Sequence, residues 1–84
     1  MKNEAAKKLI DEAAVQAPHE IPMMLGISVA LADLDTTLYL MNEIAPKMTE
    51  EIQREMQEHA LIAAGALLKA MTGAFEVPEG TPVH

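Results

Sequence analysis

Residues 21–45, IPMMLGISVALADLDTTLYLMNEIA, decide the fold of this chain because they combine a regular apolar stripe with apolar residues on both of its flanks. Large apolar side chains recur here at alternating spacings of three and four residues. Side chains at these spacings share one face of an α-helix, and so regular a stripe is typical of a helix packed against other helices. We call this stripe the seam: Met24, Ile27, Leu31, Leu34, Leu38 and Met41.

The residues beside the seam are also apolar, among them Leu25, Val29, Leu40 and Ile44. A helix that is apolar most of the way round must be covered on several sides. A β-hairpin turning near Asp33 is the alternative, but no Gly or Asn stands there for a tight turn. The pattern also continues through that point, which predicts one long central helix that ends before Pro46.

Two further helices flank the central one. Asn3 is a plausible N-cap for a short, alanine-rich helix that ends before Pro18. Thr49 is the expected N-cap of a long third helix over residues 50–72, with Gly73 as its C-cap. The apolar face predicted for the third helix comprises Ile52, Met56, Ala60, Ala63, Leu67, Met71 and Ala74.

The second half of the third helix, HALIAAGALLKAM, carries small residues around Gly65. Glycine in a helix interior costs about 1 kcal/mol relative to alanine, so close approach of another helix is the simplest reason for it. We therefore add Ala63, Gly65 and Leu67 to the surface through which the chain is expected to self-associate. The predicted fold is an all-α three-helix bundle that self-association completes, most simply as a dimer.

Length and composition support this interpretation. Eighty-four residues make one domain, placed at 1–78 with a flexible tail at 79–84, and so short a chain is marginally stable alone. Half of the residues are apolar, none is Cys, and the net charge is −7. The acidity argues against nucleic acid and against an anionic membrane surface as partners. No secretory signal is evident and no uncharged run could span a bilayer, so we expect a cytoplasmic protein.

Two polar groupings are candidate sites. Ser28, Asp35 and Asn42 recur every seven residues beside the seam, with Tyr39 within reach of Asp35, so this stripe could set the helix register or line a ligand pocket. On the third helix an acidic face is a candidate surface for a basic protein. That face comprises Glu51, Glu55, Glu58 and His59.

No motif indicates a catalytic site, a cofactor or a metal centre. The spacing Glu51, Glu55, His59 lacks the Glu-x-x-His pattern of helical-bundle metal sites. The primary hypothesis is a non-catalytic, homo-oligomeric regulator or inhibitor that binds another protein with a basic or apolar surface, as phage defence inhibitors and antitoxins do. One alternative is a ligand- or metal-binding protein or enzyme with an inter-subunit Asp/Glu/His pocket. The other is a structural subunit of a larger assembly, such as a phage particle.

Overall fold

The computed structural model describes residues 2–75, all of whose regular structure is helical, and this confirms the all-α class. The helices are α1 (Glu4–Gln16), α2 (Ile21–Ala30), α3 (Leu34–Tyr39) and α4 (Glu50–Phe75). A 3-10 turn, Pro18–Glu20, joins α1 to α2, and a π-helical turn (Leu40–Ile44) and a second 3-10 turn (Ala45–Lys47) join α3 to α4. The predicted tail at 79–84 lies outside the described residues.

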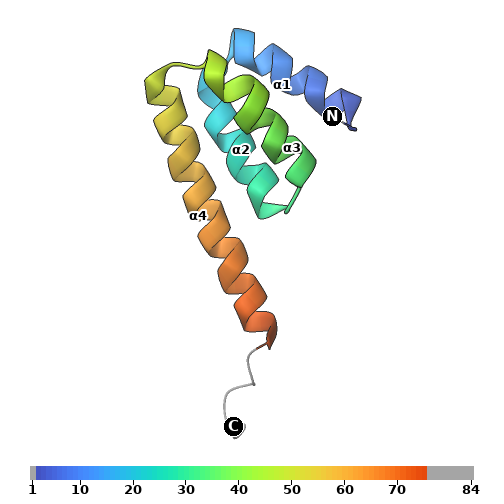
Figure 1. Cartoon of the computed structure of the whole chain (residues 1–84), viewed down its shortest axis with the longest axis vertical. Coiled ribbons are helices and arrows are strands. Elements are labelled where there is room, and N and C mark those ends of the chain that lie inside the picture. The colour runs from blue at the N-terminus through green and yellow to red at the C-terminus, as the bar shows by residue number, and fades with distance from the viewer. Residues whose placement is uncertain (1, 76–84) are drawn as a thin grey trace, which may run out of the picture.

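The helices form a small bundle from which α4 extends (Figure 1). Helix α1 lies across one end, α2 and α4 run side by side in the same direction, and α3 returns in the opposite direction. The second half of α4 continues beyond the ends of α2 and α3. This end of α4 therefore has no neighbouring helix in the described part of the chain.

Local capping explains most of the helix ends. The Asn3 side chain accepts a hydrogen bond from the Ala6 N–H (3.0 Å), and the Thr49 hydroxyl accepts one from the Ile52 N–H (3.2 Å). These two predicted N-caps are confirmed, as is the end of α1 before Pro18. The predicted C-cap at Gly73 is wrong, because α4 continues through it to Phe75.

The single central helix predicted over residues 21–45 is also wrong, because the chain turns back at residues 31–33. The Asp33 N–H donates to the Ser28 carbonyl and the Ala32 N–H donates to the Val29 carbonyl, each at 2.9 Å. This is a Schellman C-cap, with Ala32 at φ 56° in the left-handed position that glycine usually occupies. Asp33 then caps α3 by accepting hydrogen bonds from the N–H and the hydroxyl of Thr36.

Replacing Ala32 by glycine tests this turn, because the turn and a continuous helix predict changes of opposite sign in the free energy of unfolding. Since a left-handed conformation strains any residue with a Cβ, we expect Ala32→Gly to raise the free energy of unfolding by about 0.5–1 kcal/mol. In a continuous helix the same change would lower it by about as much. Urea unfolding measures the difference, with Ala70→Gly inside α4 as the control that must destabilise. Destabilisation by both changes would contradict the turn.

The core lies where α1, α2, the π-helical turn and the first half of α4 meet. It consists of Ile10, Ile21, Leu25, Leu40, Ile44 and Met56. Ile52 and Ala60 pack against this cluster, so the face predicted for the first half of α4 is confirmed. Between residues 21 and 45, however, the residues beside the seam supply the core. Most of the seam is exposed, including Leu31 (73%) and Leu34 (67%).

Candidate functional site

The turn at 31–33 separates Ser28 from the other residues of the predicted polar stripe, whereas Asp35, Tyr39 and Asn42 line one open hollow on the outer side of α3. Ser28 is buried on α2, where its hydroxyl donates to the Leu25 carbonyl (2.9 Å) and shares a hydrogen bond with the Thr37 hydroxyl (2.8 Å). Asp35 lies on α3 and accepts a hydrogen bond from the Lys2 backbone N–H (2.8 Å). Ser28 therefore has a structural role between α2 and α3, and the predicted stripe is not continuous.

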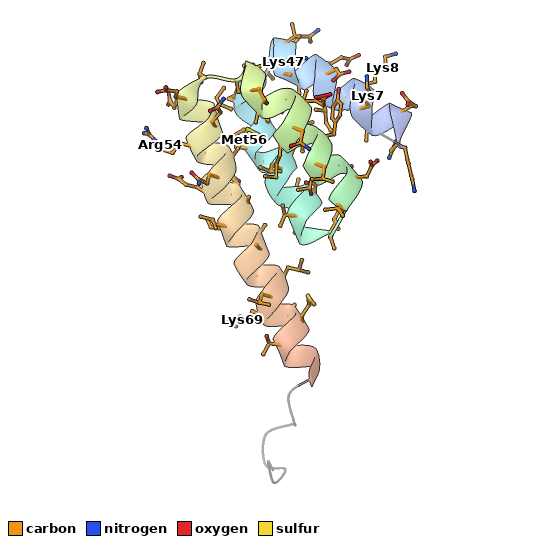
Figure 2. The ribbon with its side chains drawn as sticks, viewed as in Figure 1. Lys7, Lys8, Lys47, Arg54, Met56 and Lys69 are labelled. Atoms are coloured by element: carbon orange, nitrogen blue, oxygen red, sulfur yellow. The ribbon has the colours of Figure 1, made fainter. Side chains whose placement is uncertain are left out.

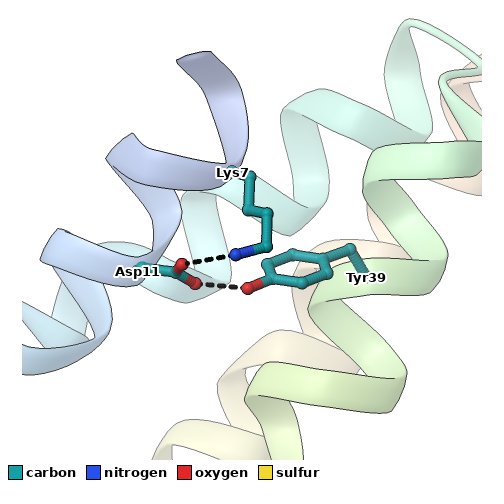
Figure 3. Close-up of polar contacts among 3 residues, drawn as sticks. All are labelled: Lys7, Asp11 and Tyr39. Atoms are coloured by element: carbon teal, nitrogen blue, oxygen red, sulfur yellow. Dashed lines mark hydrogen bonds and ion pairs between the residues drawn. The ribbon is translucent and has the colours of Figure 1, made fainter. Parts of the chain in front are cut away.

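Tyr39 does not bond to Asp35, as its spacing suggested, but donates its hydroxyl proton to Asp11 on α1 (Figure 3). The Lys7 ammonium lies 3.2 Å from the other Asp11 oxygen and 5.7 Å from the centre of the Tyr39 ring. The Tyr39 hydrogen bond, with help from Lys7, holds the pKa of Asp11 below its ordinary value. The same carboxylate raises the pKa of Tyr39 and that of Lys7. This partly buried cluster connects α1 to α3, and the Asp11 carboxylate, the Lys7 ammonium and the Tyr39 hydroxyl all take part in the connection.

The remaining acidic residues do not gather into a centre. Asp33 is occupied as the cap of α3, where hydrogen bonds from the Thr36 hydroxyl and N–H lower its pKa. Glu51, Glu55, Glu58 and His59 are exposed along α4, and their role as a partner surface stays a prediction. Within residues 2–75, no three His, Asp or Glu side chains are placed to hold a metal ion together.

Apolar side chains, rather than polar ones, form the most extensive surface feature. The exposed large ones on α1, α2 and α4 include Leu9, Met23, Ile27, Leu31, Leu61, Ile62, Leu68 and Met71. Contiguous exposed apolar groups on a small protein mark sites of interaction. All of these except Leu68 and Met71 line three open grooves around α2 and α4.

The first of these, which we call the α2–α4 groove, runs between the two parallel helices and has a volume of about 350 Å³. It is lined by Met23, Gly26, Ile27, Ala30, His59, Ile62, Ala63 and Ala66. At its floor, a Cβ on Gly26 would lie 3.4 Å from the His59 Cβ, so the helices approach closely here. Gly26 is the residue of this groove that sequence reasoning missed, and an isolated glycine inside a helical pattern was the available signal.

Two further grooves adjoin the same helices. One, of about 520 Å³, lies on the other side of α4 and includes Val29, Met41, Leu61 and Ala64. The other, of about 200 Å³, lies between α1 and α2 and includes Leu9, Met24, Ile27 and Leu31. Ile27 lines both this groove and the α2–α4 groove, so the two form one continuous apolar surface.

The predicted seam residues are therefore divided among different surfaces. Met24, Ile27 and Leu31 lie beside α1, Met41 lies beside α4, and Leu38 lies with Asp35 and Tyr39 on the outer side of α3. Ala63 lines the α2–α4 groove, and Leu67 is half-buried. Apart from its chain neighbours and the backbone of its own helix, no described atom lies within 4 Å of a Cβ placed on Gly65, so its expected close neighbour is not among the described residues.

No protein-family model matches this chain, and the comparisons with curated proteins and with solved structures find no match either. Among residues 2–75, no helix has both the length and the apolar character that crossing a membrane requires.

Proposed function

We propose that this protein is a non-catalytic, acidic, helical homo-oligomer that acts by binding another protein, as a regulator or inhibitor. The observation that carries the proposal is the set of apolar grooves around α2 and α4, which expose large aliphatic side chains such as Ile62 (74%) and Leu31 (73%). Exposing so many aliphatic groups is unfavourable, since each buried one contributes about 1.5–3 kcal/mol. Covering them with protein surface recovers that free energy.

The small size of the protomer supports the same proposal. Only six large apolar side chains are buried in the described part of the chain. A core of this size supplies little stability, and oligomerisation is a common way in which short chains acquire more buried surface. The net charge of −7 keeps such an oligomer dispersed and favours encounter with a basic partner surface.

The polar sites support binding rather than chemistry. The carboxylates of Asp11 and Asp33 and the hydroxyls of Ser28 and Tyr39 are all engaged in hydrogen bonds between or at the ends of helices. Each of these groups orders the fold. The exposed acidic residues of α4 remain available to a protein partner.

Sedimentation of the full chain over a wide range of concentrations tests the proposal. We expect a closed oligomer at micromolar concentration, most simply a dimer, with a melting temperature that rises with concentration because association stabilises the folded state. A monomer at all concentrations would refute the homo-oligomer. An open series of growing species would instead indicate a structural subunit of a larger assembly.

A further inference from the structure

We propose that the α2–α4 groove is covered by a second copy of this chain, whose α4 lies antiparallel to the first with a twofold axis near Ile62. This inference rests on the proposed self-association and specifies its surface, its register and its symmetry. The two α4 helices would pack through the side that carries Glu55, Ile62 and Lys69, and the extended end of each would lie along the charged first half of the other.

The α2–α4 groove supplies the apolar part of the proposed dimer interface. Ile62 is 74% exposed in the protomer and lies beside Met23 and Ile27, which are each about half-exposed (51%). A twofold axis at Ile62 brings two copies of this side chain together. The same contact places each copy of Ile62 against the Met23 and Ile27 side of the groove.

The charges select the partner and its direction. Glu55 and Lys69 lie seven residues before and seven residues after Ile62, which is two helical turns or about 10.5 Å on either side. Residues seven apart share one helix face. In an antiparallel pair centred on Ile62, Glu55 of each copy lies opposite the partner's Lys69, so two equivalent ion pairs flank the apolar centre. A parallel pair would place like charges together.

No contact within residues 2–75 accounts for a lysine at position 69. It is the one charged side chain between Glu58 and Glu76, in a stretch that is otherwise apolar or small. Figure 2 shows it on the extended part of α4, apart from Lys7, Lys8, Lys47 and Arg54. Within the described residues, neither Lys69 nor Glu55 takes part in an ion pair, and about 21 Å of helix separates the two.

The same register brings the partner's helix close to Gly65. Gly65 lies three residues after Ile62, about 4.5 Å along the helix from the twofold axis and within about 60° of the contact face. In the protomer His59 already packs against a glycine, Gly26, while the space around Gly65 is open. The missing side chain at Gly65 would let the partner's helix approach closely at this level.

The opposite side of α4 lacks this symmetry. It presents Leu61, Ala64, Leu68 and Met71, with no acidic and basic residue placed at equal distances from a central one. A second copy could still bury these side chains. Nothing on that side would select the antiparallel direction, so this side is the alternative that the experiment must separate.

Charge reversal tests the pairing in the full-length protein. We expect Glu55→Lys and Lys69→Glu each to raise the dimer dissociation constant roughly tenfold at low ionic strength, since each change replaces two attractive contacts by repulsive ones. Equimolar mixing of the two single variants restores both ion pairs, because one copy then carries two lysines and the other two glutamates. The mixture should form a heterodimer about as tight as the wild-type dimer. Native mass spectrometry identifies the heterodimer, and sedimentation measures the constants.

Matched control variants separate an effect at the proposed interface from an effect of the changed net charge. Glu43→Lys and Lys8→Glu change the net charge equally at exposed positions away from the α2–α4 groove, and should leave dimerisation unchanged. The double variant Glu55→Lys/Lys69→Glu should dimerise like the wild type, and circular dichroism confirms that each variant is helical. A wild-type oligomer that neither reversal weakens would overturn this interface while leaving self-association in place. A wild-type monomer would overturn both.

Discussion

Replacing Leu40 by alanine is expected to lower the free energy of unfolding by about 2–5 kcal/mol, whereas Leu34→Ala should change it by less than about 0.5 kcal/mol. Leu40 is fully buried (0% exposed) in the core with Ile21 and Ile44, so truncation leaves a cavity. Leu34 is 67% exposed at the start of α3, so truncation removes little buried surface from the protomer. Domains of this size are marginally stable, and Leu40→Ala should be largely unfolded at 37 °C.

Urea unfolding at low protein concentration, where the monomer dominates, measures this contrast. The two residues are matched in type and lie six positions apart, so they differ chiefly in burial. Comparable losses for both variants would show that the seam, not the residues beside it, forms the core of the protomer. That outcome would contradict the turn at residues 31–33 as well, since a continuous helix would present a different face.

The second large effect is expected at Ile62. Ile62→Asp should weaken self-association by at least about 100-fold, or about 2.7 kcal/mol, because it places two carboxylates at the centre of an apolar contact. The protomer should remain folded, since this side chain is already 74% exposed in it. Sedimentation gives the dissociation constant, and circular dichroism at low concentration gives the helix content.

Leu68→Asp is the matched control for this prediction. Leu68 lies on the same helix, is similarly exposed (64%) and projects about 120° away from Ile62 round the helix axis. It should therefore leave the dissociation constant within about threefold of the wild-type value, a difference of about 0.7 kcal/mol. Dissociation caused by Leu68→Asp and not by Ile62→Asp would move the interface to the opposite side of α4.

Local signals in the sequence were sufficient for much of the fold. Asn3, Pro18 and Thr49 act on backbone groups within a few residues of themselves, and the helix ends they predicted are the ends observed. The face of α4 that carries Met56 was also predicted correctly. In that part of the helix, charged residues lie on both edges of the apolar stripe, so only one side of the helix can face the core.

The turn between α2 and α3 was not predicted, for a local reason and a tertiary one. The left-handed position that usually holds glycine holds Ala32, so the commonest sequence signal of a helix end is missing. The apolar spacing also continues through the turn. Asp33 was the remaining sequence signal of a new helix, because Asp is a common N-cap and its carboxylate accepts a hydrogen bond from the Thr36 N–H. The continuous apolar periodicity favoured one unbroken helix instead.

The sequence alone thus determined the all-α class, where α1 begins and ends, where α4 begins, and which side of the first half of α4 is buried, because each depends on neighbours within a few residues. Only the tertiary structure decided which apolar side of residues 21–45 forms the core. Those residues are apolar almost all the way round, so periodicity offers several equivalent faces. The choice depends on where α1 and α4 lie, and it buries Leu25, Leu40 and Ile44 while leaving Ile27 and Leu31 at the surface.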